Sequence, residues 1–225
     1  MASRIIHIAI ANELEKILPV KDKNRFLIGH LLPDAVLSAN KREVNTHFVD
    51  IYDNGSKKHF DSYSFFDRYA KEILSDALYL GYYFHLIQDG IFRSVLYYDI
   101  NLISLRSVPG FIDELYNDYR ILNGRAIKKY GLEYNFFEPE NFKQEKINEI
   151  FPFEVTDFIK DIYNDFNTET DEEPKYFKVE QAIKFINECI KVCVSEYRAI
   201  ICGNHAVGAY DYSWETRTSD SKLKE

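Results

Sequence analysis

The chain has few residues that break helices. Nine glycines and six prolines are spread over 225 residues, so turn signals are sparse. Such a sequence suits long helices joined by short loops, and alternating apolar and polar residues do not recur over any length typical of strands. We therefore predict a single all-α, multi-helix domain over residues 1–225, in which residues 210–225 form a polar tail.

Cysteine is scarce as well. The three cysteines, Cys189, Cys193 and Cys202, are an odd number crowded into one segment, which argues against a disulfide framework. We interpret them as buried thiols in a reducing compartment rather than as a metal or redox site.

The first apolar run is short and continues into an amphipathic pattern, unlike a signal peptide. With no run near the roughly 18 apolar residues that a membrane span needs, we expect a cytoplasmic protein without a transmembrane segment.

Positive charge is in deficit. Lysine and arginine total 28 against 36 aspartates and glutamates, a formal net charge of −8. Binding of duplex nucleic acid needs a positive stripe that displaces counterions, so the composition disfavours that class of partner. A metal-loaded pocket in an acidic protein could still take a phosphate ester, because the ions supply local positive charge.

Apolar residues recur at i, i+3 and i+4 in most of the chain, which indicates amphipathic helices. Ser3 is the expected cap of the first helix, and Gly203 the expected end of the last. Gly81 indicates a turn or a close contact between helices. The expected helices cover residues 3–18, 22–32, 64–79, 80–98, 111–130, 153–166 and 175–202.

One of these helices carries polar residues inside an apolar run. His85 and Asp89 are four residues apart, so both side chains lie on one face, about 6 Å apart along the axis. A histidine and a carboxylate one turn apart can bind one cation as deprotonated ligands. Such a pair is more often simply hydrogen bonded, so the spacing alone leaves both interpretations open.

Three further residues could add ligands, and each has an ordinary structural explanation. His7 lies at the edge of the buried face of the first helix, where a satisfied core histidine is common. Asp34 follows Pro33 and could be a helix N-cap. His47, between Thr46 and Phe48, lies in an expected loop, where a histidine is commonly just solvated.

The order and context of these residues resemble a known family. The motifs are a histidine in the first helix, Gly29-x-x-x-Pro33-Asp34, Thr46-His47-Phe48, and Gly81-Tyr82-x-x-His85-Leu86-x-x-Asp89. Together they resemble the zinc-dependent phospholipase C family, within the phospholipase C and P1 nuclease superfamily. The resemblance covers roughly residues 1–95, and it implies the all-α fold of that superfamily.

The resemblance also implies a metal site and a reaction. Asp34, His47 and His85 would hold one metal ion, His7 a second, and Asp89 would bridge the two. Asp34 and Asp89 are thereby the candidate catalytic residues. The expected cofactor is Zn²⁺, two ions per chain, although other divalent metals suit the same ligands. The expected activity is hydrolysis of a small phosphoester or a phospholipid by a water that the two metals activate.

This chain also departs from the family. Secreted members begin with a tryptophan that binds metal, whereas this sequence begins with Met1. No histidine occurs between Asp89 and His205, so we expect the third metal site of some members to be absent. Arg93, one turn beyond Asp89, could contact a substrate phosphate, pair with Asp89 or form a surface salt bridge. His30 could support the site or belong to the core, and His205 could return to the site.

Two alternatives to this hydrolase remain. The first is a helical binding or regulatory module that has lost catalysis and keeps a structural metal or none. The second is a metal phosphohydrolase of the His-Asp type, which is disfavoured because no His-Asp dipeptide occurs. The sequence assigns neither a role to residues 131–175 nor an oligomeric state.

Overall fold

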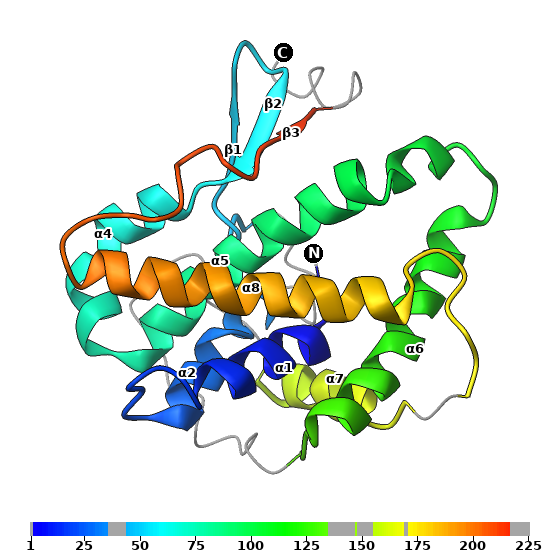
Figure 1. Ribbon diagram of the computed structural model, residues 1–225, viewed down its shortest axis with the longest axis horizontal. Helices are drawn as coiled ribbons and strands as arrows, with labels where there is room; N and C mark the ends of the chain where they lie inside the picture. The colour runs from blue at the N-terminus through cyan, green and yellow to red at the C-terminus, as the bar shows by residue number, and fades with distance from the viewer. Residues whose placement is uncertain (1, 36–43, 135–146, 148–154, 169–170, 217–225) are drawn as a thin grey trace.

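The computed structural model describes residues 2–35, 44–134, 147, 155–168 and 171–216, and the chain over these ranges is mostly helical (Figure 1). The short segments include 3-10 turns at Leu32–Asp34 and Leu102–Leu105 and a π-helical turn at Val95–Asp99. The α-helices are α1 (Arg4–Leu14), α2 (Lys23–Gly29), α4 (Ser62–Ser75), α5 (Ala77–Ser94), α6 (Phe111–Tyr130), α7 (Val155–Phe166) and α8 (Val179–Ile200).

The helix boundaries confirm some expectations and correct others. The Ser3 side chain accepts the amide hydrogen of Ile6 and caps α1, as expected, but α1 ends at Leu14 rather than at residue 18. The break between the two central helices lies at Asp76, not at residue 79. Asp76 has extended backbone angles, and its carboxylate accepts the amide of Leu78, so it acts as the N-cap of α5.

Helix α5 is the centre of the fold. It contacts α1, α2, α4 and α8, and α8 crosses the molecule in front of it (Figure 1). Every residue from Leu78 to Phe92 is buried. A helix that is apolar on all sides must be surrounded by other elements, so the polar residues of α5 are buried with the rest.

A pair of glycines lets α2 and α5 approach closely. A Cβ atom on Gly29 would overlap the carbonyl oxygen of Leu78, and one on Gly81 would overlap the carbonyl oxygen of Phe26. Gly81 lies inside α5 and not at a turn, so the expectation of a close helix contact is the correct one. The contact brings the end of α2 against the turn of α5 that precedes His85.

A small sheet departs from the all-α prediction. The three strands β1 (Val49–Tyr52), β2 (Lys57–Phe60) and β3 (Trp214–Glu215) pair antiparallel in the order β1-β2-β3. Trp214 is 8% exposed and its ring lies 4.8 Å from that of Phe60. The start of the expected polar tail, up to residue 216, is therefore packed against the fold, and residues 217–225 of the tail lie outside the described ranges.

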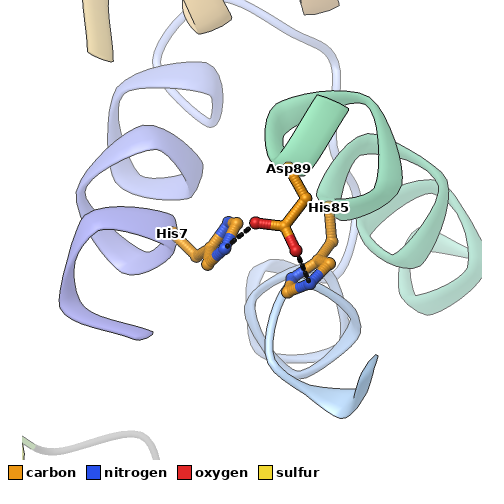
Figure 2. Close-up of side chains that lie close together, drawn as sticks. All are labelled: His7, His85 and Asp89. Carbon is orange, nitrogen blue, oxygen red and sulfur yellow. Dashed lines mark ion pairs between the residues drawn. The ribbon is translucent and has the colours of Figure 1, made fainter. Parts of the chain in front are cut away.

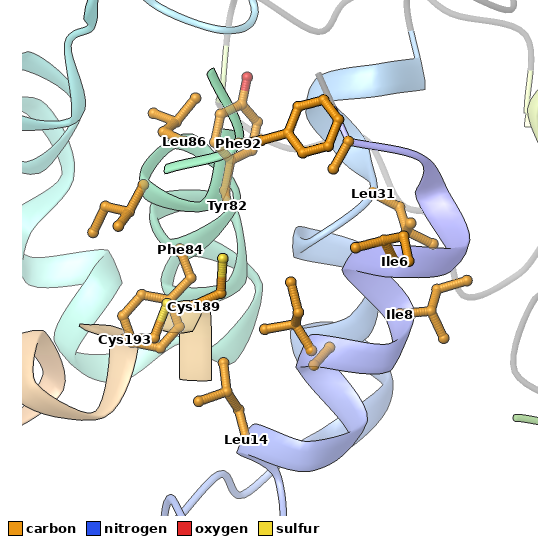
Figure 3. Close-up of a cluster of buried hydrophobic side chains, with 14 of the residues drawn as sticks. Ile6, Ile8, Leu14, Leu31, Tyr82, Phe84, Leu86, Phe92, Cys189 and Cys193 are labelled. Atoms are coloured by element: carbon orange, nitrogen blue, oxygen red, sulfur yellow. The ribbon is translucent and has the colours of Figure 1, made fainter. Parts of the chain in front are cut away.

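The hydrophobic core lies where α1, α5 and α8 meet (Figure 3). Cys189 and Cys193 are buried in it, as predicted, whereas Cys202 is exposed after the end of α8. None of the described helices combines the length and apolarity that a membrane crossing requires. Residues 36–43, 135–146 and 148–154 lie outside the described ranges.

Candidate metal centre

Five buried side chains from four parts of the chain meet beside α5. His7 comes from α1, Asp34 from the end of a 3-10 turn, and His47 from the segment before β1, while His85 and Asp89 come from α5. His7, His85 and Asp89 are fully buried, Asp34 is 3% exposed and His47 is 7% exposed. These are the five residues that the sequence analysis singled out.

The first group of potential ligands consists of His7, His85 and Asp89, whose ligand atoms all lie within 4.8 Å of one another. The Asp89 carboxylate lies between the two imidazoles (Figure 2). Its Oδ1 atom is 3.4 Å from His7 Nε2, and its Oδ2 atom is 3.6 Å from His85 Nε2. The two oxygens of one carboxylate thus face two different histidines.

The second group consists of Asp34, His47 and His85, again within 4.8 Å. The Nε2 atom of His47 lies 3.3 Å from Asp34 Oδ1 and 3.2 Å from His85 Nε2. The same atom is 3.5 Å from Asp89 Oδ2. His85 therefore belongs to both groups, and Asp89 reaches toward both.

The outward-facing nitrogens of His7 and His85 are held by neighbours. His7 Nδ1 donates to the side-chain oxygen of Gln88 at 2.7 Å, and His85 Nδ1 donates to the carbonyl oxygen of His30 at 2.7 Å. A neutral imidazole carries one ring proton. In His7 and in His85 that proton is on Nδ1, so the Nε2 atoms that face Asp89 carry lone pairs.

His47 has the same arrangement. The hydroxyl of Thr46 donates to the carbonyl oxygen of Pro33 at 2.7 Å, so its oxygen accepts from His47 Nδ1 at 3.2 Å. The lone pair of His47 is again on Nε2, toward the cluster. Tyr82 fixes this segment from α5, because its hydroxyl donates to the carbonyl oxygen of Thr46 at 2.5 Å. This contact gives a physical role to the tyrosine that precedes His85 in the motif.

The lone pairs on the Nε2 atoms of the three imidazoles therefore face one another and the lone pairs of the two carboxylates. Within the described part of the chain, His7 Nε2, Asp34 Oδ1 and Asp89 Oδ2 are buried without a hydrogen-bond partner. Buried polar atoms without partners cost free energy, so such a cluster calls for a cation. Imidazole nitrogens and carboxylate oxygens are suitable ligands for zinc, and the residues present fit a metal. Protonated imidazoles at the same Nε2 atoms are the alternative source of positive charge.

Both carboxylates are ionised at neutral pH. Burial by itself would raise the pKa of Asp34, but the adjacent His47 and His85 side chains, whose imidazoles can carry positive charge, lower it to about 2. Burial likewise opposes ionisation of Asp89. The neighbouring His7 and His85 side chains outweigh it and hold the pKa of Asp89 well below its usual value. In addition, the backbone amide of Ala2 donates to Asp89 Oδ1 at 2.9 Å.

The remaining histidines lie outside the cluster. The His30 side chain belongs to the core, where its Nδ1 donates to the carbonyl oxygen of Phe26 and burial lowers its pKa to about 3. Its contribution to the site is the backbone carbonyl that holds His85. His205 does not return to the site, because its Nδ1 lies 2.7 Å from the buried carboxylate of Glu196.

A cavity of about 500 Å³ opens beside Asp34. It is bounded by the start of α1, the end of α5, the turn at Leu102–Leu105, and α6. Arg93 lines it, with its guanidinium 5.5 Å from the centre of the Trp214 ring. Sequence reasoning missed the three other arginines of the lining, Arg4, Arg106 and Arg120, because no motif or helical spacing links them to the histidines.

Comparisons of this chain with protein-family models, with curated proteins and with solved structures yielded no match.

Proposed function

We propose that this protein is a metal-dependent phosphoester hydrolase that holds two zinc ions and resembles the zinc-dependent phospholipase C family in fold type and site. One observation carries the proposal. Three buried imidazoles, each with its Nδ1 proton held by an outer partner, direct their Nε2 lone pairs toward two ionised carboxylates. An outer partner that fixes the tautomer is characteristic of metal-binding histidines.

The two groups of ligands suggest how the metals would be shared. Asp34, His47 and His85 would hold one ion, and His7 the other, with Asp89 common to both. Three neutral imidazoles and two carboxylates offset half the charge of two dications, so the loaded site would attract an anionic phosphoryl group. Two such ions would polarise a phosphoryl oxygen and lower the pKa of a water molecule.

The residues of the chain would position this chemistry. Gln88, Thr46 and the His30 carbonyl keep the imidazoles oriented, and the Ala2 amide fixes one oxygen of Asp89. Arg93 follows Asp89 by one turn and lines the cavity, where it can contact phosphate oxygens. Hydrolysis would form one P–O bond from water and break the ester P–O bond, with a proton passing to the departing alcohol.

The test begins with metal content. We expect protein purified without added metal to contain about two zinc ions per chain by elemental analysis. The His85→Ala variant should lose both ions, whereas His205→Gln, a histidine outside the cluster, should retain them. Zinc-loaded protein should then hydrolyse at least one member of a phosphoester panel, and His85→Ala should not.

Two results would contradict the proposal in different ways. Protein without metal, whose thermal stability is unchanged by added zinc, would leave the five residues as a hydrogen-bonded cluster. Zinc-loaded protein that hydrolyses no phosphoester would instead support a binding or regulatory module with a structural metal.

A further inference from the structure

The start of α1 forms one wall of the cavity beside the candidate metal centre. Ala2, Ser3 and Arg4 line this wall, and Asp34 of the centre lines the same cavity. Ser3 is the N-cap of α1, so the positive end of the helix dipole lies at the wall. Helices α6 and α7 pack against α1 and contribute further polar side chains to the lining. An anion held next to Asp34 would therefore meet the start of α1.

The Arg4 guanidinium has hydrogen-bond donors to spare. Its Nε donates to Oδ2 of Asp165, on α7, at 2.6 Å. A guanidinium also has donors on both Nη atoms, and neither of these donates a hydrogen bond within the described ranges. Asp165 thus fixes the side chain through Nε, while the Nη groups keep their hydrogens for a ligand in the cavity.

Arg4 also senses the charge of the metal centre. Burial by itself would lower the pKa of Arg4, but the charge and hydrogen bond of Asp165 and the charge of Asp34 raise it. The guanidinium therefore stays charged beside Asp34. If zinc ions occupied the centre, their charge would more than offset that of Asp34, and Arg4 would then face a positive neighbour. An anion that bridges the metals and Arg4 would relieve this repulsion.

Asn123 adds a second donor to the wall. It belongs to α6, lines the cavity and is 5% exposed. The Ser3 hydroxyl accepts the amide of Ile6 at 3.4 Å and donates to Oδ1 of Asn123 at 2.6 Å. The amide group of Asn123 is thereby oriented, and its Nδ2 donates no hydrogen bond to any described residue. A nearly buried N–H group without an acceptor costs free energy, so it calls for a ligand oxygen.

We propose that Arg4 and Asn123 bind the phosphoryl group of the substrate, an inference that rests on the proposed hydrolase function. The Nη groups of Arg4 and Nδ2 of Asn123 donate hydrogen bonds to the phosphoryl oxygens that the metals do not hold. Asp165 and Ser3 are positioning residues, since each holds the donor side chain by another atom. A phosphoryl group suits this wall because a guanidinium can donate two parallel hydrogen bonds to its oxygens.

The test measures the binding of inorganic phosphate to zinc-loaded protein by calorimetry, so it needs no turnover. We expect Arg4→Gln to bind phosphate about tenfold more weakly than wild type. Arg4→Lys should recover part of the loss, because lysine restores the charge without the paired donors. Asn123→Asp keeps the shape of the side chain and an acceptor for the Ser3 hydroxyl, but it replaces the donor with a negative charge. It should therefore weaken phosphate binding at least as much as Arg4→Gln.

A second variant separates this binding role from a structural ion pair. Asp165→Asn breaks the same ion pair as Arg4→Gln, yet it keeps an acceptor for Nε and removes a negative charge from the lining. We expect it to bind phosphate more tightly than wild type. Arg125→Gln is the matched control, because Arg125 lies outside the lining, pairs with Glu173 and should leave the affinity unchanged. Elemental analysis and thermal melting verify that each variant is loaded and folded.

The outcomes separate this inference from the function on which it rests. Unchanged phosphate affinity in folded, zinc-loaded Arg4→Gln, or zinc-loaded wild-type protein that binds no phosphate, would overturn the phosphoryl site and leave the metal centre intact. Equal weakening in Arg4→Gln and Asp165→Asn would also overturn it, since the ion pair would then act only through the structure. Wild-type protein that binds no zinc would overturn the hydrolase proposal, and this inference with it.

Discussion

The Nε2 atoms of His47 and His85 lie 3.2 Å apart, although each imidazole donates its Nδ1 proton elsewhere. Two neutral imidazoles held in this way have no hydrogen to share. Either an added proton or a metal ion must lie between the ring nitrogens and the carboxylates around them.

The first prediction concerns the sharing of ligands. His85 belongs to both groups and His7 to one. His7→Ala should therefore leave about one zinc ion per chain, and His85→Ala about none. Elemental analysis of both variants after purification without added metal measures the difference. Identical losses in the two variants would contradict the shared ligand.

The second prediction concerns the contact between α2 and α5. Gly81→Ala places a methyl group against the Phe26 carbonyl, and a backbone atom cannot yield as a side chain can. We expect a loss of about 3 kcal/mol in the free energy of unfolding, measured by chemical denaturation. Gly55→Ala is the control, since no atom lies within 4 Å of its added methyl group and its φ of +86° should cost only about 1 kcal/mol. Equal effects of the two substitutions would refute the close contact.

The third prediction concerns Glu196, a buried carboxylate outside the two groups of potential metal ligands. Glu196 is fully buried and accepts the amides of Ala206 and Val207, the hydroxyl of Tyr83, and a hydrogen bond from His205. Glu196→Ala should destabilise the protein by about 3 kcal/mol, because several buried donors lose their acceptor.

Zinc content provides the control for Glu196. Glu196→Ala protein that remains folded should retain its metal, because Glu196 is in neither ligand group. Tyr83→Phe removes one of the four donors and should cost about 1 kcal/mol. Equal losses of stability in Glu196→Ala and Tyr83→Phe would contradict the view that the carboxylate holds residues 205–207 in place.

The fourth prediction is a pH dependence at the start of α5. Burial would raise the pKa of Asp76, but hydrogen bonds from Arg25 and from the amide of Leu78, with the charge of Arg25, lower it. The stabilisation from this ionised group is complete above the ordinary aspartate pKa of about 3.9, and it is lost as the pH falls through the lowered pKa.

Asp76→Asn isolates this charge, because asparagine is an equally good N-cap. We expect the variant to be less stable by about 1 kcal/mol near neutral pH, where the partly exposed pair with Arg25 is screened by solvent. Denaturation curves between about pH 7 and about pH 3 should show that the difference in the free energy of unfolding between wild type and Asp76→Asn decreases as Asp76 is protonated. A difference in the free energy of unfolding that stays constant over this pH range would show that the loss of stability does not come from the charge of Asp76.

The parts of the structure that follow local rules could be predicted from the sequence. The repeating apolar residues predicted α6 from Phe111 to Tyr130 with the bounds that it has. Spacing alone placed His85 and Asp89 on one face of a helix. The mutual approach of Asp34, His47 and His7 has no local signal, so it could be expected only from the resemblance to a family.

The sheet and the cavity could not be predicted because they depend on long-range contacts. Strand β3 has two residues, and it pairs with β2 more than 150 residues earlier in the chain, so no alternating pattern precedes it. Arg4, Arg93 and Arg106 line one cavity because the start of α1, the end of α5 and the turn at Leu102–Leu105 all bound it. The periodicity of apolar residues predicts neither very short strands nor contacts between segments that are far apart in the sequence.

The most direct test of the metal centre is zinc K-edge X-ray absorption on protein purified without added metal. We predict zinc coordinated only by nitrogen and oxygen, at about 2.0–2.2 Å, with the outer-shell scattering of imidazole rings. The His7→Ala variant should reduce the edge height, and His85→Ala should abolish it. No zinc edge, or sulfur ligands from cysteine at about 2.3 Å, would contradict a zinc centre built from these histidines and aspartates.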